Sequence, residues 1–319
     1  MNDASATFGT AAYGGPGFHP RTAPHRAEIG TVWAQSGIDS EWRPLRAVLL
    51  HRPGDELAAS ADDPDAVQML APVDAARAAA EHDALAAVYR GEGVAVHYVA
   101  PAATPKPNQM FCADLMLATP EGVILARPAS TVRAGEERAV ARRLADLGVP
   151  IVRTLGGTAI FEGADAMWLD AATVAIGRGH RTNDEAIFQI TAALAAVGVT
   201  ALPFDLPFGT MHLMGMLRIV DRDLAIAWPR RTPFALVRAL EARGMRVAFL
   251  PESDPETMNR ALNLVTLGPR RIVMNGGFAE IQGFFEGLGI ACVTLTAREL
   301  IKAAGGFGCL TGVLERECD

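Results

Sequence analysis

The sequence predicts an α/β protein built as a five-bladed propeller, in which five similar ββαβ-type modules surround one axis. Two observations predict this fold. An amphipathic helix, a glycine and a short β-rich run follow one another five times, and the glycines recur every 45–55 residues. Two strand-like runs precede four of the helices, giving about three strands per helix, whereas a doubly wound sheet has about one. The repeated glycines are Gly93, Gly148, Gly198, Gly244 and Gly289.

The elements follow from local signals along the chain. Asp74 begins the first helix, and Thr182 with Glu185 forms a capping-box pattern before the third. Turn residues separate the paired runs, as hairpins require. The first module has only one leading strand, 46–52, so we expect segment 307–316 to supply its partner and to close the ring. The paired runs are 110–119 with 122–127, 159–169 with 173–178, 211–220 with 224–229, and 262–268 with 271–276.

Composition excludes several classes of protein. Half of the 319 residues are hydrophobic, and acidic side chains exceed basic ones by 36 to 29, which argues against a nucleic-acid partner. Four cysteines are too few for a disulfide scaffold and favour a reduced, cytoplasmic protein. No apolar run is long enough to span a membrane. We expect residues 1–40 to form an extended arm and 41–319 a single domain, with the arm favouring a homo-oligomer.

Polar residues interrupt the apolar first strands at nearly the same place in each module. Such positions converge on the axis of a radial repeat, where a thiolate could attack, an imidazole transfer protons and a carboxylate orient the imidazole. Each residue alone has a structural explanation, because a lone buried cysteine or histidine is usually part of a core. Buried acids, however, are rare without partners, so the whole set favours an active site. The residues are Asp114, Glu162, Asp165, His212, Asn263 and Cys309.

Other chemistries lack their sequence signals. The seven histidines form no HxxxH or HxH pair and no CxxC is present, so we expect no metal. A phosphate-binding loop and a dinucleotide fingerprint are also missing, so we expect no cofactor. Gly305, Gly306 and Gly308 would let the backbone approach closely around Cys309. Arg133 and Arg181 each precede a predicted helix and could bind a substrate carboxylate, although either could equally be a solvated surface residue.

These motifs together resemble the guanidino-group modifying enzymes, which comprise arginine deiminases, dimethylarginine dimethylaminohydrolases and amidinotransferases. The resemblance covers roughly residues 41–317. It implies a five-bladed α/β propeller and a covalent amidino-thioether intermediate on the cysteine of a Cys–His–acid site. The motifs that carry it are LRAVLLHRPGDEL, an acid in the next first strand, FEGAD, GRGHRTN, MHL and GGFGC.

The resemblance also implies roles for individual residues. Cys309 matches the nucleophile, His212 the general acid/base and Glu162 the acid that orients the histidine. Asp114 matches the carboxylate that binds guanidinium nitrogens. Arg133 and Arg181 match the arginines that bind the α-carboxylate in dimethylarginine dimethylaminohydrolases, and we group Asp165 with the substrate-binding residues.

Two departures from the deiminase pattern concern the substrate. Ala113 stands where deiminases have arginine, and Met214 where they have a second guanidinium-binding aspartate. With Met216, Met214 is expected to form an apolar wall suited to a substituted guanidine or another amidine. The sequence therefore predicts a hydrolase for a small guanidino or amidino compound. An amidinotransferase is the alternative, and a binding protein that has lost catalysis is a third possibility.

Overall fold

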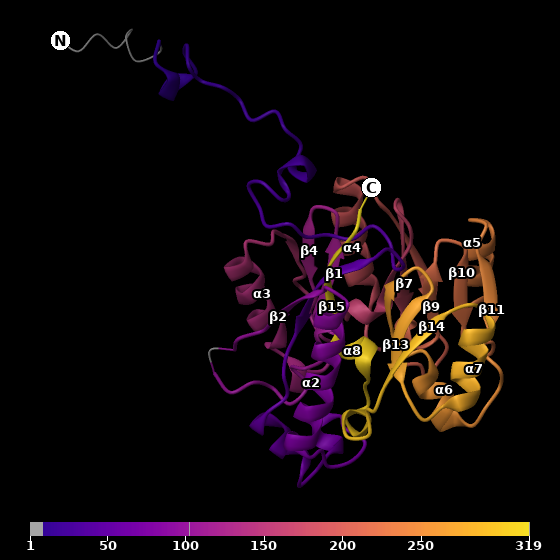
Figure 1. Cartoon of the computed structure of the whole chain (residues 1–319). Helices are drawn as coiled ribbons and strands as arrows, with labels where there is room; N and C mark the ends of the chain where they lie inside the picture. The colour runs from indigo at the N-terminus through magenta and orange to yellow at the C-terminus, as the bar shows by residue number, and fades with distance from the viewer. Residues whose placement is uncertain (1–8, 102, 319) are drawn as a thin grey trace.

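The computed structural model describes residues 9–101 and 103–318 and contains five three-stranded sheets around a common centre (Figure 1). In every sheet the middle strand pairs antiparallel with the first strand and parallel with the third. Sheet by sheet, in the order first, middle and third strand, the strands are β15 (Gly312–Arg316), β1 (Leu45–Leu50) and β2 (Ala95–Tyr98); β3 (Met116–Thr119), β4 (Gly122–Leu125) and β5 (Ile151–Thr154); β6 (Ala166–Asp170), β7 (Thr173–Arg178) and β8 (Thr200–Asp205); β9 (Leu217–Asp221), β10 (Leu224–Ala227) and β11 (Arg246–Phe249); β12 (Val265–Gly268), β13 (Arg271–Asn275) and β14 (Ala291–Leu295).

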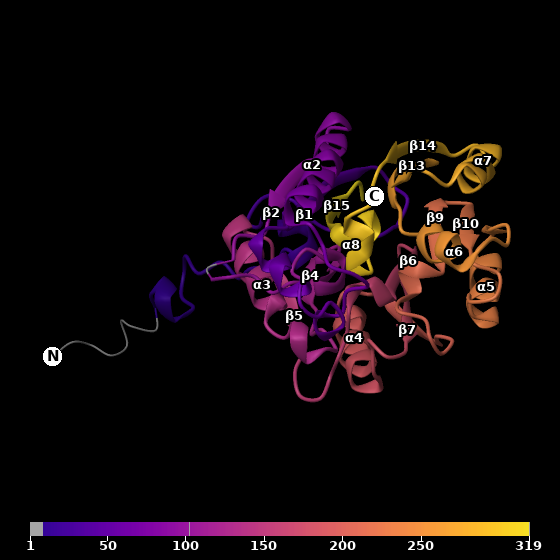
Figure 2. The ribbon, with the colours of Figure 1, turned by 90° about the horizontal axis from the view of Figure 1, so that it is seen from below.

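One helix joins the middle strand of each sheet to the third strand, because parallel neighbours need a crossover connection. Seen along the ring, these helices lie at the outside and the short helix α8 lies at the centre (Figure 2). The predicted α/β propeller of five modules is thus confirmed. The module helices are α2 (Ala75–Gly91), α3 (Glu136–Leu147), α4 (Asp184–Ala196), α5 (Phe234–Glu241) and α7 (Ala279–Gly287), and the additional ones are α6 (Pro255–Ala261) and α8 (Phe307–Leu310).

Short 3₁₀ turns connect these elements. They include η1 (Ala11–Tyr13), η2 (His25–Glu28), η3 (Asp55–Ser60), η4 (Asp65–Val67), η6 (Thr131–Arg133) and η9 (Leu300–Ala303).

The five repeated glycines all adopt the left-handed backbone expected after a helix, with φ between 75° and 79°. Asp74 caps α2 by accepting a hydrogen bond from the Arg77 amide, as predicted. The capping-box prediction at Thr182 is wrong. Asn183 caps α4 instead, and the Thr182 hydroxyl is drawn away because it donates to Asp165 at 2.7 Å.

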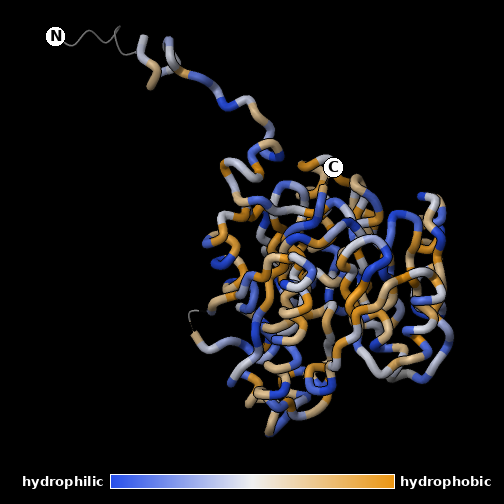
Figure 3. Tube along the Cα trace, viewed as in Figure 1, coloured by the Kyte–Doolittle hydropathy of each residue, from blue (hydrophilic) through white to orange (hydrophobic). Residues whose placement is uncertain are grey.

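The two ends of the propeller domain close the ring as predicted. Strand β15 pairs antiparallel with β1, from Leu45 opposite Arg316 to Leu49 opposite Gly312. The apolar core includes fully buried residues such as Trp168 and Phe285. Hydrophobic stretches of the chain run through the body of the molecule (Figure 3). Because ring closure leaves the turns at one end of every sheet facing the same axis, residues distant in sequence meet there.

The first described part of the chain leaves the body (Figures 1 and 3), and the division into an arm over 1–40 and a single domain over 41–319 stays a prediction. The later part of this segment is held to the propeller, where the Ala34 amide donates to Gly148 and the Gly37 amide to Leu314. The structure holds one chain, so the expected homo-oligomer also stays a prediction. Among the described residues, no helix is both long and apolar enough to cross a membrane.

Candidate active site

The polar residues singled out in the sequence lie on turns, not inside the first strands as expected. Asp114 is in the 3₁₀ turn η5 (Cys112–Leu115) directly before β3, and Glu162 and Asp165 flank or end η7 (Gly163–Asp165) before β6. His212 precedes η8 (Leu213–Gly215) and β9. Strand pleating would send alternate side chains into the apolar layers, whereas a turn leaves them all at the open end of the sheet. That end is where the modules converge.

Cys309 lies on the one-turn helix α8, just before the closing strand β15, and is only 9% exposed. The predicted close approach of the glycines is confirmed. A methyl group on Gly305 would collide with the Phe111 ring, and one on Gly306 would lie 2.9 Å from Asn263 Cγ. Burial and the nearby Asp114 raise the pKa of the Cys309 thiol. The thiol is therefore neutral at neutral pH before a ligand binds.

His212 and Glu162 form a buried ion pair, with Nε2 2.7 Å from Glu162 Oε2. Burial alone would lower the pKa of His212, but the surrounding carboxylates, Asp114 foremost, raise it to about 9. Burial would raise the pKa of Glu162, but the hydrogen bond and charge of His212, with two arginines, lower it to about 2. The imidazolium is thus the resting form, and its Nδ1 is the ring atom left for a substrate.

Asp114 has one satisfied and one unsatisfied oxygen. Oδ2 accepts from Arg133 Nη1 at 2.7 Å. Oδ1 is buried without a hydrogen-bond partner among the described residues, and lies 4.0 Å from His212 Nδ1. A buried carboxylate oxygen without a donor is costly, so this atom is a ready acceptor for a ligand that brings N–H groups.

The two predicted carboxylate-binding arginines are both engaged by acids. Arg133, 3% exposed, bonds Asp114, Glu162 and Glu136, the last through Nε at 3.0 Å and Nη2 at 2.8 Å. Arg181 is more accessible and donates to both Glu162 oxygens at 3.0 Å. Binding of a substrate carboxylate by Arg133 would require these ion pairs to open, and for both arginines that role stays a prediction.

Asp165 lies behind His212 and away from the cavity surface. It is fully buried, and its oxygens accept from the Thr182 hydroxyl and from the Leu213 amide at 3.0 Å. Burial raises the pKa of Asp165 to about 6. Asp165 therefore supports the turn that carries His212 and lines neither cavity, and its grouping with the substrate-binding residues stays a prediction.

Glu136 is a buried partner of Arg133 that sequence reasoning missed. It is fully buried in the first turn of α3. Acidic residues are common in first turns because of the helix dipole, so the sequence held no signal that would separate Glu136 from the half-buried Glu137.

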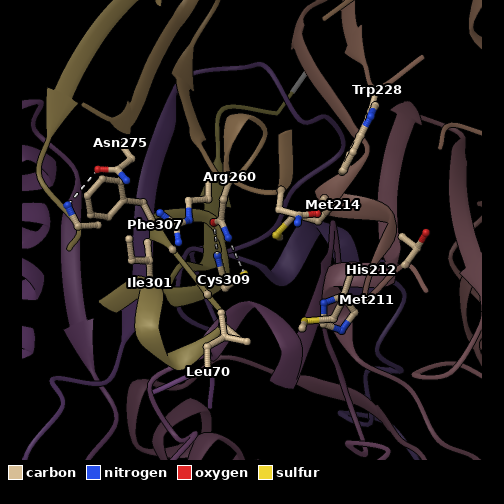
Figure 4. Close-up of a pocket in the computed structure, with 18 of the residues that line it drawn as sticks. Leu70, Met211, His212, Met214, Trp228, Arg260, Asn275, Ile301, Phe307 and Cys309 are labelled. Carbon is tan, nitrogen blue, oxygen red and sulfur yellow. Dashed lines mark hydrogen bonds between the residues drawn. The ribbon is translucent and has the colours of Figure 1, made fainter. Parts of the chain in front are cut away.

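Two adjoining cavities connect these groups. The larger has a volume of about 280 Å³ and is lined by Cys309, His212 and Met214 on different elements (Figure 4). The smaller, about 30 Å³, is lined by Asp114, Arg133 and Arg181 and shares Cys309 and His212 with the first. Met214 contributes apolar surface, as expected. The prediction for Met216 is wrong, because this side chain is fully buried in the core and lines neither cavity.

Asp114, Glu162 and His212 bring three potential ligand atoms within 4.8 Å of one another. Sequence spacing gave no sign of this group, because its members come from three modules. Arg133 and Arg181 already supply positive charge to its carboxylates. The expectation of a metal-free protein stays a prediction.

The propeller and its convergent Cys, His and acid residues define the class of guanidino-group modifying enzymes, which includes hydrolases and amidinotransferases. The family described as N,N dimethylarginine dimethylhydrolase, eukaryotic, matches residues 62–261. The chain belongs to this family.

Two curated relatives and two solved structures illustrate the similarity. An uncharacterized Bacillus subtilis protein, YkgA, is 25% identical over 236 residues, covering 74% of this chain and 79% of that protein. A dimethylarginine dimethylaminohydrolase of Streptomyces coelicolor is 24% identical, covering 64% of this chain and 74% of its own.

Among solved structures, the dimethylarginine dimethylaminohydrolase of Pseudomonas aeruginosa, a cysteine-to-serine mutant with citrulline, has a TM-score of 0.71 at 20% identity. The alignment covers 86% of this chain and 100% of that one. An amidinotransferase of saxitoxin biosynthesis from Microseira wollei also scores 0.71, at 15% identity, covering 89% and 98%. At these identities the structures establish the shared fold.

Proposed function

We propose that the protein is a cysteine-dependent hydrolase that cleaves a C–N bond of a guanidino or amidino compound. The observation that carries this proposal is the unpartnered Asp114 Oδ1, buried beside Cys309 and His212 at a shared cavity. A guanidinium group supplies planar N–H donors and a positive charge, which is what this oxygen lacks. The relatives named as dimethylarginine dimethylaminohydrolases support the same substrate class.

The charge of the site also favours a cation. Four buried carboxylates, those of Asp114, Glu136, Glu162 and Asp165, face two arginines and one imidazolium. Burial raises the pKa of Glu136 to about 7, so part of this negative charge is neutralised by a proton, and the place that lacks a cation is the unpartnered Asp114 Oδ1. We therefore place the guanidinium carbon of the substrate between Asp114 and the Cys309 sulfur.

The reaction steps follow from two resting protonation states, the neutral thiol of Cys309 and the imidazolium of His212. A cation beside Cys309 favours the thiolate, so the thiol proton leaves to solvent when the substrate binds. The sulfur forms a bond to the guanidinium carbon, and the His212 imidazolium donates its proton to the departing nitrogen. The C–N bond breaks, an amine leaves, and an amidino-thioether remains on Cys309.

Water completes the reaction. The now neutral His212 accepts a proton from a water molecule that attacks the same carbon, and the C–S bond breaks to return the thiolate. The products are an amine and a ureido compound. Glu162 keeps the imidazole oriented through both steps because its Oε2 stays bonded to Nε2.

We further propose that the substrate is an N-substituted guanidine. Met214 offers apolar surface where a second carboxylate would bind unsubstituted nitrogens, and the larger cavity of about 280 Å³ leaves room for a substituent.

An amidinotransferase is the second candidate function. The same cavity has room for an acceptor amine, and the chain shares its fold with an amidinotransferase.

A substrate screen with defined products tests both candidates. Arginine, methylated arginines, agmatine and short guanidino acids would be incubated with and without glycine as acceptor, and ureido and amidino products would be identified by mass spectrometry. The hydrolase predicts ureido product without acceptor. Product that forms only with acceptor would contradict it and establish the transferase. The Cys309→Ser variant is the control for background reaction.

A further inference from the structure

Arg218, in β9, is a buried cation whose role the reaction above does not use. Arg218 is 8% exposed, and its Nε donates to the Leu262 carbonyl at 2.8 Å. Its Nη2 has no hydrogen-bond partner among the described residues. A buried charged donor left unsatisfied is costly. Arg218 lines neither cavity, so its free donor is not directed at a ligand site.

The guanidinium group lies against the turn that carries the thiol. A methyl group built on Gly308 would collide with Arg218 Nη2 and would lie 2.9 Å from both Asn263 Oδ1 and the Leu264 carbonyl. Glycine next to Cys309 is therefore required so that Arg218 can approach the backbone. The positive charge lies next to the residue that precedes the nucleophile, and it lines neither cavity.

Asn263 holds the same turn from a second direction. Its Oδ1 accepts from the amides of Gly308 at 2.8 Å and Cys309 at 3.3 Å, which turns Nδ2 toward the sulfur at 3.1 Å (Figure 4). The two backbone donors fix the orientation of the side-chain amide. A side-chain donor at this distance favours the thiolate over the thiol.

The charges around Cys309 come from several elements. Burial is the main cause that raises the pKa of the Cys309 thiol, and the carboxylate of Asp114 in η5 raises this pKa further. The Gly306 backbone, Asn263 and Arg218 lower the pKa of the thiol. His212 faces the thiol across the cavity. Burial lowers the pKa of Arg218 to about 10, so its guanidinium group stays charged at neutral pH. Besides Cys309, the charged or titratable groups that act on Arg218 are Glu41, Arg316 of β15 and Tyr89 of α2.

We propose that Arg218 and Asn263 are positioning residues that stabilise the Cys309 thiolate, Arg218 through its charge and Asn263 through its hydrogen bond to the sulfur. This inference rests on the proposed function in assigning the nucleophile to Cys309. Arg218 lines neither cavity, whereas Asn263 lines the larger one beside the sulfur. Both act on the sulfur, so the expected signature is a change in thiol reactivity with pH.

Thiol alkylation without substrate tests the inference. The rate of modification of Cys309 by iodoacetamide would be followed by peptide mass spectrometry between pH 6 and 10. Arg218→Met and Asn263→Asp should each lower the rate at pH 7 at least about tenfold and shift the profile to higher pH. Asn263→Asp keeps the acceptor for the two amides but replaces the donor facing the sulfur with a negative oxygen.

Arg316→Met is the matched control. Arg316 is also buried and bonds the carbonyls of Arg43 and Thr266, so its loss should lower the melting temperature without moving the profile. If Arg218→Met does not fold, Arg218→Gln, which keeps a polar side chain without the charge, takes its place. Unchanged profiles in the Arg218 and Asn263 variants would overturn the inference, as would an equal shift in Arg316→Met.

The outcome is separable from that of the proposed function. Shifted profiles in a protein that converts no guanidino compound would reject the substrate class and keep the inference. Turnover with unshifted profiles would do the reverse.

Discussion

The two sides of the cavity satisfy their buried polar groups in opposite ways. On one side, which we call the acid wall, Glu162 bonds His212 and both arginines, Asp114 bonds Arg133, and one acceptor oxygen of Asp114 is left over. On the other, the thiol wall, Cys309 and Asn263 lie in front of Arg218, and a donor is left over.

This difference matches the charges that a guanidino reaction brings to each wall. The acid wall lacks a cation, and a guanidinium substrate would supply one. The thiol wall lacks an anion, and ionisation of Cys309 would supply it. Substrate binding and thiol ionisation are therefore expected to favour each other, because the new pair of charges is attractive in a low-dielectric site.

The largest expected effect is on the thiol wall. Cys309→Ser should lower kcat/KM at least about a thousandfold, because an alcohol is a far weaker nucleophile without a base to ionise it. The fold should be kept, since the change is nearly isosteric. Steady-state kinetics with the best substrate of the screen, alongside thermal unfolding, would measure both. The exchange Cys292→Ser is the control; comparable losses in the two variants would contradict the assignment.

The acid wall makes a prediction about stability and pH. The folded pKa of His212, about 9, lies above its ordinary value of 6.5 because of the neighbouring carboxylates. The stabilisation from its proton is complete below about pH 6.5 and is lost as the pH rises through about 9, a change on the order of 3 kcal/mol. Urea unfolding between pH 6 and 9.5 would measure it. Burial raises the pKa of Glu136 to about 7, so this residue contributes a slope below about pH 7.5 in both proteins. Above about pH 7.5 the slope should vanish in His212→Asn, and an identical slope there in both proteins would contradict the prediction.

Asp114 tests the substrate class directly. Asp114→Asn removes the charge and turns one acceptor into a donor, so kcat/KM should fall about a hundredfold, or about 2.7 kcal/mol. The melting temperature should also fall, because buried Arg133 loses one of its three acids. Glu136→Gln is the matched control: it takes another acid from Arg133 but lines neither cavity. Near-normal kinetics in Asp114→Asn would mean that the substrate is not a cation.

How far the sequence could predict this molecule depends on the range of the interactions involved. The five modules followed from local signals, because a glycine after a helix and a turn between two strands are recognisable within a few residues. The convergence of Asp114, His212 and Cys309 followed from the repeat. Their place on turns did not, because a short apolar run containing one polar residue looks the same whether it begins as a 3₁₀ turn or a strand.

The pairing within the site was less predictable still. The sequence predicted that Arg133 could bind a substrate carboxylate, yet it is bonded to Glu136 three residues later. It is also bonded to Asp114, 19 residues before it, and to Glu162, 29 residues after it. Arg218 gave no signal at all, since an arginine in a strand is usually solvent-exposed at one face. Such long-range contacts depend on how the modules pack, and one sequence holds no record of them.

The smallest expected effect concerns Arg181, the more accessible arginine of the acid wall. If it binds a substrate carboxylate, Arg181→Met should raise KM about tenfold, or about 1.4 kcal/mol, for a carboxylate-bearing guanidine and much less for agmatine, which has none. Arg178→Met is the control, because Arg178 lies on the same segment as Arg181 but lines neither cavity. Arg178 pairs with the exposed Asp184 and Asp205. An equal loss for both substrates, seen mainly in kcat, would show that Arg181 acts only by holding Glu162 against His212.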